Sequence, residues 1–411
     1  CLPGNTIELI QIAPFGDPYY FNINDSHVAI RKETANEVNV VIENTKMGSV
    51  TNPDGYYVIM NIPVGTYTIS VSLMGYKKIT MENISISADL TTELNFDLEE
   101  TVIQGEEVVI VADKPLVEKH ITQSYSKVSA EELRNTPVKG LNDILAVQPS
   151  IVVQDDAVHI RGGREEEVGY YLDGAAVSNP LDRTNALYVI QDAVEEVQVL
   201  AGGYTAEYGG ANSGIVKTEM KTGGSDMEAS VDFQSDKFAG EGDKFLNTYS
   251  FKEHYLTASI GGPLLSKNLR YFVAVENRDQ GDYRRRFSEG FEFTDLKDRS
   301  VTNPKAVDDT NLYTISYKDG FTPKNRRNRW AVNSTLLWDF NPFRLRFSAV
   351  YNWRRTYYTA TPMLEILNER ERYNDLNQLL MSGTFTHVIT PRIYYDLKFS
   401  MYNQKSEYLD D

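Results

Sequence analysis

The sequence is short of cysteine, of long apolar runs and of positive charge, and each shortage excludes a class of protein. One cysteine, Cys1, among 411 residues rules out an internal disulfide framework. No run of about 18 or more apolar residues is present, so we expect no transmembrane helix. A net charge of −17 argues against a nucleic-acid partner, because binding to phosphates needs a basic surface.

Residues suited to catalysis are also scarce. The five histidines are scattered without the spacing of metal ligands, at His27, His120, His159, His254 and His387. The Gly-x-Ser-x-Gly motif of hydrolases is absent, and the glycine-rich stretch 202–214 lacks the phosphate-binding Gly-x-x-x-x-Gly-Lys-Ser/Thr motif. We therefore predict no enzyme activity, no cofactor and no metal site.

Turn signals divide residues 36–100 into short segments that favour strands. Asn-Pro-Asp-Gly at 52–55 and Asn-Ile-Pro-Val-Gly at 61–65 are such signals, because Pro fixes φ and Gly accepts a positive φ. Many short strands separated by turns predict a small Ig-like β-sandwich. The expected strands are 38–43, 56–60, 66–73, 84–86 and 92–98. Residues 1–35 lack this pattern and are expected to be an irregular or atypical N-terminal segment.

Residues 118–223 mix helical and strand signals, which predicts a small α/β domain with a mixed sheet. Ser129 and Glu132 form a capping box, in which each side chain binds the backbone amide of the other residue. A second helix is expected over 139–147, with its large apolar residues on one face and Pro149 ending it. Strands are expected at 151–153, 158–161, 169–172, 194–200 and 213–218.

Beyond residue 224 apolar and polar residues alternate with a period of two, which puts each set on one face of a strand. In 330–340, for example, Trp330 and Trp338 fall on one face and Asn333 on the other. Strands of about ten residues, joined alternately by tight turns and long polar loops, are typical of an outer-membrane β-barrel with aromatic girdles. The tight turns are 266–268, 341–342 and 390–391, and the long loops are 278–328 and 354–376.

An ordered set of landmarks runs through the second region. They are Leu-Arg-Asn-Thr-Pro-Val at 133–138, Ile-Arg-Gly-Gly at 160–163, Tyr-Leu-Asp-Gly at 171–174, Glu-Glu-Val-Gln-Val-Leu at 195–200 and Ala-Glu-Tyr-Gly-Gly-Ala-Asn-Ser-Gly-Ile-Val at 206–216. In this order and spacing they resemble the plug domain of TonB-dependent outer-membrane receptors. The resemblance assigns to the plug motif Arg161, Gly162, Asp173, Gly174, Tyr208, Gly209 and Gly214. Arg161 and Asp173 could pair within the plug or with charges on the barrel wall.

Two further segments resemble parts of such receptors. Residues 51–57 and 62–67 are similar to the carboxypeptidase-regulatory-like domain that often precedes the plug. Residues 101–117 are expected to be a linker with a segment that resembles the TonB box, namely Glu107, Val108, Val109, Ile110, Val111 and Ala112. An extended Val-rich segment can add as a strand to the sheet of a partner. A last strand of the sandwich and a β-prone linker are the two other interpretations of this segment.

The resemblance implies an architecture and a set of partners. The fold is expected to be mainly β, with the sandwich at 36–100, an α/β plug at 118–223 and an incomplete antiparallel transmembrane β-barrel at 224–411. Family barrels have about 22 strands, so the chain is expected to be the N-terminal part of a longer receptor. The implied partners are periplasmic TonB, outer-membrane lipid, an extracellular ligand and a surface lipoprotein.

The implied function is energised import through a plugged barrel in the cell outer membrane of a Gram-negative bacterium, with the sandwich in the periplasm. Glycan, peptide, iron chelate and vitamin are the ligand classes left open. Ligand contacts are expected from the plug loops 162–169 and 178–185 and from the loop after Arg278. The alternative function is that of a secreted soluble β-rich binding or adhesion module without transport, and a hydrolase is a distant third.

Overall fold

The computed structural model describes residues 7–12, 19–23, 26–30, 38–45, 47–88, 90–100, 107–111, 124–135, 140–154, 157–179, 183–204, 208–240, 243–281, 287–288, 290–297, 312–317, 320–321, 326–340, 342–358, 372–390 and 393–410. Strands dominate these residues, as the alternating sequence predicts, and helices are few and short. No helix in these ranges is long and apolar enough to cross a membrane.

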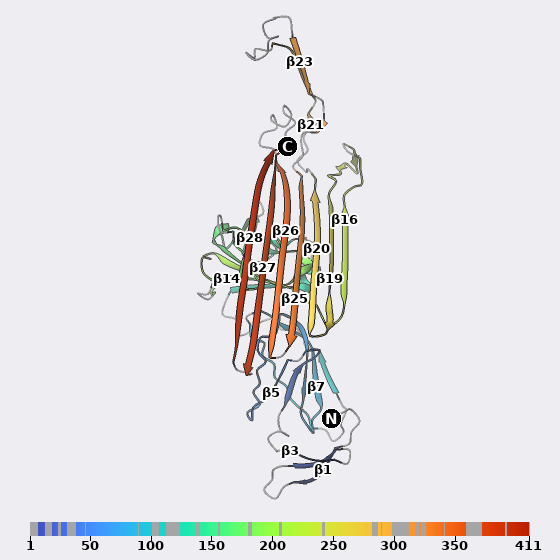
Figure 1. Cartoon of the computed structure of the whole chain (residues 1–411), viewed down its shortest axis with the longest axis vertical. Coiled ribbons are helices and arrows are strands. Elements are labelled where there is room, and N and C mark those ends of the chain that lie inside the picture. The colour runs from blue at the N-terminus through green and yellow to red at the C-terminus, as the bar shows by residue number, and fades with distance from the viewer. Residues whose placement is uncertain are drawn as a thin grey trace.

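The largest unit is a seven-stranded antiparallel sheet in the order β16-β19-β20-β25-β26-β27-β28 (Figure 1). Its strands are β16 (Glu228–Ser235), β19 (His254–Ser266), β20 (Leu269–Gln280), β25 (Arg327–Phe340), β26 (Phe343–Tyr358), β27 (Arg372–Thr390) and β28 (Ile393–Asp410). Only two residues separate the strands of each of the hairpins β19–β20, β25–β26 and β27–β28, which confirms the expected tight turns. The sheet is not closed, since β16 and β28 are its two edges.

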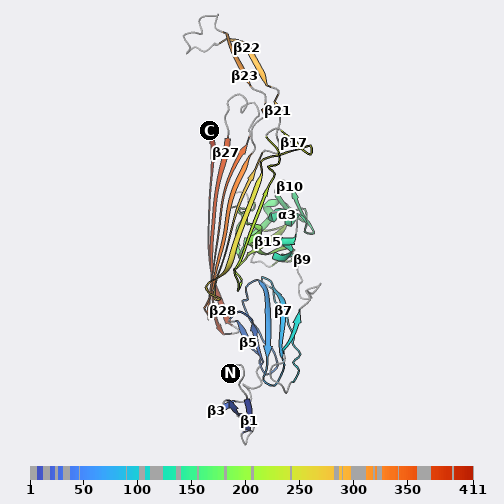
Figure 2. The same ribbon diagram turned by 90° about the vertical axis from the view of Figure 1, so that its right-hand side faces the viewer.

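The two faces of this sheet differ in character, as the period of two requires. On β25 the residues Ala331, Asn333, Thr335 and Leu337 are buried, whereas Trp330 and Trp338 are 43% and 45% exposed. Figure 2 shows the reason: residues 124–221 lie against one face of the curved sheet, and the other face is uncovered. We call the sheet the wall, residues 124–221 the plug, and the covered face of the wall its inner face.

The plug has a mixed five-stranded sheet in the order β13-β12-β15-β14-β9, a hairpin β10–β11 and two short helices. These elements are β9 (Ser124–Ser129), α2 (Ala130–Asn135), α3 (Leu141–Ala146), β10 (Ile151–Gln154), β11 (Ala157–Ile160), η1 (Glu165–Glu167), β12 (Val168–Leu172), β13 (Ala175–Ala176), η2 (Gln191–Ala193), β14 (Val194–Gly202) and β15 (Gly214–Met220). The expected capping box is present, because the Ser129 amide donates to Glu132 Oε2 at 3.0 Å and the Glu132 amide to Ser129 Oγ at 3.4 Å.

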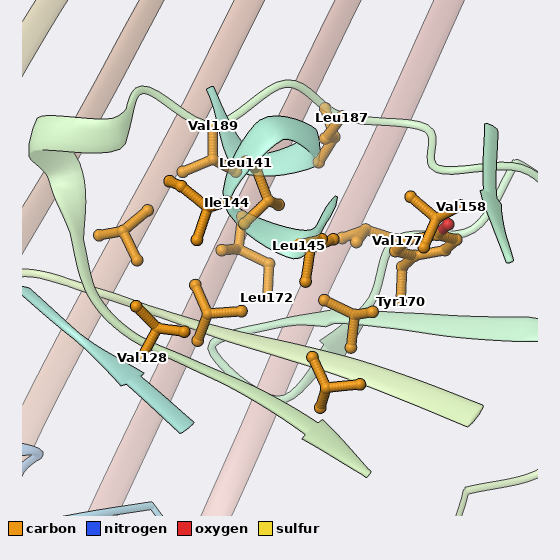
Figure 3. Close-up of a cluster of buried hydrophobic side chains, with 14 of the residues drawn as sticks. Val128, Leu141, Ile144, Leu145, Val158, Tyr170, Leu172, Val177, Leu187 and Val189 are labelled. Atoms are coloured by element: carbon orange, nitrogen blue, oxygen red, sulfur yellow. The ribbon is translucent and has the colours of Figure 1, made fainter. Parts of the chain in front are cut away.

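The apolar face of α3 closes the core of the plug. Leu141, Ile144 and Leu145 are buried and point toward the strands, together with side chains from β12 and β14 (Figure 3). Two wall residues on the inner face, Val350 and Leu380, complete the same cluster. A second buried cluster joins Ile190 and Ala193 of the plug to Phe272, Ala274 and Ala331 of the wall. The plug therefore has an apolar interior of its own and two smaller apolar contacts with the wall.

The sandwich has a five-stranded sheet in the order β5-β4-β6-β7-β8. Its strands are β4 (Asn39–Ile42), β5 (Gly48–Val50), β6 (Gly65–Ser72), β7 (Lys78–Ile86) and β8 (Glu107–Val111). The expected strands 56–60 and 92–98 are wrong, because neither segment is in a hydrogen-bonded ladder. Their apolar residues nevertheless pack on the core of the sheet, and the Tyr57 hydroxyl donates to the Leu94 carbonyl at 2.9 Å. Burial of alternate residues gave these segments a strand pattern without strand pairing.

The N-terminal segment also differs from expectation. Strands β1 (Ile7–Ile12), β2 (Tyr19–Ile23) and β3 (Ser26–Ile30) form an antiparallel sheet where an irregular segment was expected. At the opposite end of the molecule, the long connection between β20 and β25 contains two small hairpin pairs, β21 (Phe287–Ser288) with β24 (Gly320–Phe321) and β22 (Phe291–Lys297) with β23 (Leu312–Tyr317) (Figure 1).

Candidate functional site

The Asp173-Gly174 turn joins the plug to the wall. It connects β12 to β13 with φ of +49° at Asp173 and +77° at Gly174, so glycine suits the second position. The two Asp173 carboxylate oxygens accept three hydrogen bonds: Oδ1 from Arg346 Nη2 at 2.7 Å and from the Met220 amide at 2.9 Å, and Oδ2 from Ser348 Oγ at 2.5 Å. Asp173 thus pairs with the wall, which is one of the two pairings expected from the sequence.

Glu219 is the second carboxylate at this junction. Its Oε2 lies 3.9 Å from Arg346 Nη2, so one guanidinium serves two acidic side chains of the plug. Burial, followed by the nearby Asp173 carboxylate, raises the pKa of Glu219 to about 8. A proton can therefore be bound or released at this plug–wall contact near neutral pH.

Backbone groups of an irregular plug segment, residues 186–193, are held by amide side chains of the wall. Asn333 Oδ1 accepts from the Ile190 amide at 3.1 Å, Asn352 Nδ2 donates to the Tyr188 carbonyl at 3.0 Å, and Gln378 donates to the Ala186 carbonyl. All three amides are on the inner face, at positions that the alternation marks as polar. The alternation puts Asn333 and Asn352 on the polar face of their strands, but it does not indicate what they bind.

Tyr188 anchors the same segment to a charged pair of the wall. Its hydroxyl donates to Glu276 Oε2 at 3.1 Å, and the Arg329 guanidinium stacks 3.3 Å from the centre of its ring. Arg329 Nη2 also donates to Glu276 Oε1 at 3.0 Å. Burial raises the pKa of the Tyr188 hydroxyl, which therefore stays protonated and donates.

The remaining motif residues shape the plug itself. Arg161 and Gly162 form a turn with φ of +52° and +76°, and the Arg161 side chain lies against Gly202. The Tyr208 ring packs edge-on against Tyr171 at 5.1 Å. Gly214 is tightly enclosed, because a Cβ there would lie 2.7 Å from Ile160 Cδ1. Asp173 is the predicted motif residue whose side chain bonds to Arg346 and Ser348 of the wall.

The segment that resembles the TonB box forms β8. It is the last strand in the order of the sandwich sheet and pairs in parallel with β7, with Val108 opposite Ile79 and Ile110 opposite Met81. The structure therefore has a sandwich strand within the expected linker 101–117. Ala112 lies outside the described residues.

The sandwich touches both the plug and the tight-turn end of the wall. At the wall, Asn61 Nδ2 donates to Thr386 Oγ1 at 3.1 Å and to Asp396 Oδ1 at 3.3 Å, and the Asn61 carbonyl accepts from Arg344. At the plug, the Ala88 amide donates to Glu196 Oε1 at 3.4 Å, and its carbonyl accepts from Gln198 Nε2 at 3.1 Å. Three parts of the chain thus meet in one contact network.

A cavity of about 1060 Å³ lies where these three parts approach each other. Its lining is mostly polar and includes Arg134, Asp192, Glu195 and Lys221 of the plug. Burial raises the pKa of Glu195 and lowers that of Lys221. Within the described part of the chain, no group of three or more His, Cys, Asp or Glu residues is placed to hold a metal ion.

Family models match three segments of the chain. The TonB-dependent Receptor Plug Domain matches residues 117–216, which contain the wall-binding turn at Asp173. The CarboxypepD_reg-like domain matches residues 28–110, which cover the sandwich and most of β8. The FeoA domain matches residues 1–42, for which the sequence analysis named no family.

The chain is also similar to one curated protein and to solved structures. The TonB-dependent transporter Oar of Myxococcus xanthus is 24% identical over 192 residues, which are 44% of this chain and 18% of that protein. Among solved structures, the outer membrane transporter YddB from Escherichia coli is 12% identical with a TM-score of 0.44, covering 65% of this chain and 37% of its own. The ferric-catecholate import receptor Fiu, also from E. coli, is 13% identical with a TM-score of 0.46, covering 71% and 40%. The chain thus spans less than half of each relative. The chain thus carries the plug domain of TonB-dependent receptors, behind a CarboxypepD_reg-like domain and ahead of a long antiparallel sheet.

Proposed function

We propose that the chain serves TonB-dependent import of an extracellular ligand across the outer membrane. The observation that carries the proposal is a separately folded plug seated by polar contacts on the inner face of a curved antiparallel sheet. We call these plug–wall contacts, made by Asp173 with Arg346 and by residues 186–190 with Asn333, Asn352 and Gln378, together with the two apolar contacts, the seat of the plug. A domain with its own apolar core can leave the seat without unfolding completely. The hydrogen bonds of the seat are ones that water can replace, and its apolar contacts are smaller than the plug core.

The outer face of the wall supports a place in the membrane. Trp330 is paired with Trp353 near one end of the sheet, and Trp338 lies beside Phe340 and Phe343 near the other. The eight residue steps from Trp330 to Trp338 span about 27 Å along a strand, or about 21 Å after a tilt of about 40°. This spacing matches the apolar band of about 25 Å between the aromatic girdles of outer-membrane barrels.

The tight turns and the long connections give the direction of the wall. Outer-membrane barrels have short turns on the periplasmic side and long loops outside. The sandwich contacts the tight-turn end through Asn61, and β21 and β23, which lie between β20 and β25 in the chain, are found beyond the opposite end (Figure 1). We therefore place the sandwich in the periplasm, where TonB would bind the segment Glu107–Ala112. Ligand contacts are assigned to 162–169, 178–185 and the 281–326 connection, and a surface lipoprotein remains a candidate partner.

Two experiments on the full-length receptor in its source bacterium test the proposal. In density-gradient fractions the protein should travel with the outer membrane and require detergent for extraction; release as a soluble protein would contradict the location. Deletion of the receptor gene and deletion of tonB should cause the same growth defect on one class of nutrient. The panel would hold iron chelates, cobalamin, glycans and peptides. A defect that tonB deletion does not reproduce would contradict energised import.

A further inference from the structure

The candidate TonB box is part of a sheet. Strand β8 pairs with β7 over five residues, from Lys78 opposite Glu107 to Glu82 opposite Val111. It is last in the strand order, so within the described residues its second edge carries no neighbouring strand. Val109 is 55% exposed. A free strand edge is a template to which another chain can add.

We infer that the energy-coupling partner binds β8 while β8 still belongs to the sandwich, by adding a strand to its free edge. This inference rests on the proposed function and specifies how the partner is recognised. The docking surface is then the edge of a six-stranded sheet that forms across the two proteins, with the sandwich supplying five strands.

Pre-organisation favours this mode of binding. In a parallel ladder, alternate residues turn their amide and carbonyl groups to opposite sides, so β7 can use only one set. The other set of β8 faces the free edge. A loose linker would have to lose backbone freedom when a partner binds, whereas β8 has already lost it on β7. The Val108 and Ile110 positions are opposite Ile79 and Met81, which belong to the apolar side of the sandwich sheet.

Charge specifies the kind of partner. Residues 36–111 contain eleven acidic and three basic residues. Two of the basic residues are neutralised locally, because Lys77 Nζ lies 3.4 Å from Glu99 and Lys78 Nζ 3.2 Å from Glu43. The partner that fits is a periplasmic domain with an exposed β-edge flanked by lysine or arginine, since opposite charges accelerate and orient encounters.

The same arrangement determines the path of a pulling force. The sandwich is fixed to the wall through Asn61 and Arg344 and to the plug through Ala88. While β8 stays on β7, a pull on β8 loads the sandwich and its contacts with the wall and with the plug surface. Only after β8 separates from β7 does the chain beyond Val111 carry the load to the plug. The β7–β8 pair would therefore hold the partner before it releases the plug.

A disulfide across the pair tests this order of events. Thr80 and Val109 are register partners, so Thr80→Cys with Val109→Cys, in a Cys1→Ser background, should link β7 to β8 on oxidation. The probe is the purified periplasmic domain of TonB from the source bacterium, and the receptor is full length in lipid nanodiscs. Asn39→Cys with Val50→Cys is the matched control, because it links an exposed pair on β4 and β5, away from the β7–β8 edge of the same sheet.

Oxidised T80C/V109C receptor should bind the TonB domain with a Kd within about twofold of the reduced form. Under force spectroscopy with the TonB domain on the probe, the oxidised form should show no plug extension, and reduction should restore it. The N39C/V50C control should extend in both states. Loss of binding on oxidation, with binding by the reduced form, would overturn the inference and show that the partner takes β8 only after it leaves β7. Failure of the reduced form to bind would instead overturn the proposed function.

Discussion

The interior of the plug and its seat on the wall are built from different chemistry. The interior is a cluster of leucine, isoleucine and valine side chains that is closed by α3, with several members fully buried. The seat combines a carboxylate, a guanidinium and three amides with two apolar contacts. Val350 and Leu380 of the wall join the plug core, and Phe272, Ala274 and Ala331 of the wall pack with Ile190 and Ala193 of the plug. Burial of apolar surface keeps the plug folded, whereas hydrogen bonds to the wall can be exchanged for bonds to water. A domain that must leave the wall and stay folded needs a core that is more stable than its contacts with the wall.

The largest effect should come from damaging the interior. Leu145→Ala removes a fully buried side chain from α3 and should destabilise the plug by about 2–5 kcal/mol. Hydrogen exchange of the full-length receptor in detergent should show faster exchange across the plug while the wall strands stay protected. Val147→Ala is the control, because Val147 follows α3 and is 61% exposed. Equal effects of the two variants would contradict the assignment of this core.

The next effect should come from the seat. Arg346→Ala leaves the Asp173 carboxylate buried without its cation and should weaken plug–wall contact by about 2 kcal/mol. The peptide containing Met220, whose amide donates to Asp173, should exchange about thirtyfold faster, while peptides from α3 keep their protection.

Two variants sharpen the test of the seat. Asp173→Asn together with Arg346→Met should cost less than Arg346→Ala alone, because no charge is then left unpaired. Phe347→Leu changes the opposite face of the same strand and should leave exchange at Met220 unchanged. Faster hydrogen exchange in α3 after Arg346→Ala would mean that the stability of the plug interior depends on the seat.

Much of the architecture could be predicted from the sequence, because local chemistry determines it. The Ser129–Glu132 capping box, α3 and the two-residue turns of the wall all depend on residues close together in the chain, and all are confirmed. The expected strands at 56–60 and 92–98 failed because burial gives the same alternation with or without a ladder. The FeoA match and the strands β1–β3 were not predicted, because no pattern in the N-terminal residues indicated them.

The sequence predicted residues of the seat but not how they pair. Asp173 was singled out by its motif, and the alternation beyond residue 224 puts Arg346 on the polar face of a strand. Their pairing joins residues 173 positions apart and depends on how the plug is placed on the wall. Long-range placement of this kind leaves no periodic signal in a single sequence. The role of Glu107–Ala112 and the ligand regions stay predictions.

A smaller effect, on pH dependence, should come from Glu219. Its ordinary pKa of 4.5 rises to about 8 in the folded protein, so the protonated form is favoured there. The stabilisation is complete below pH of about 4.5 and is lost as pH rises through about 8. Exchange at Met220 should therefore accelerate between these pH values, after correction for the intrinsic pH dependence of exchange. Glu219→Gln should flatten the profile, and a profile unchanged by this substitution would contradict the assignment.

The smallest effect should come from the contact between the sandwich and the wall. This contact belongs neither to the plug interior nor to the seat. Asn61 has a φ of +56° and donates to Thr386 and Asp396. Asn61→Gly keeps the backbone conformation accessible and removes only the side-chain bonds, for a cost of about 0.5–1 kcal/mol. Asn61→Ala adds the strain of a positive φ and should cost more.

Hydrogen exchange in the peptide 59–65 should rise about two- to fivefold in Asn61→Gly with no change in α3 or at Met220. A change at Met220 would show that the sandwich supports the seat of the plug, and the division between interior and seat would then extend to a third part of the chain.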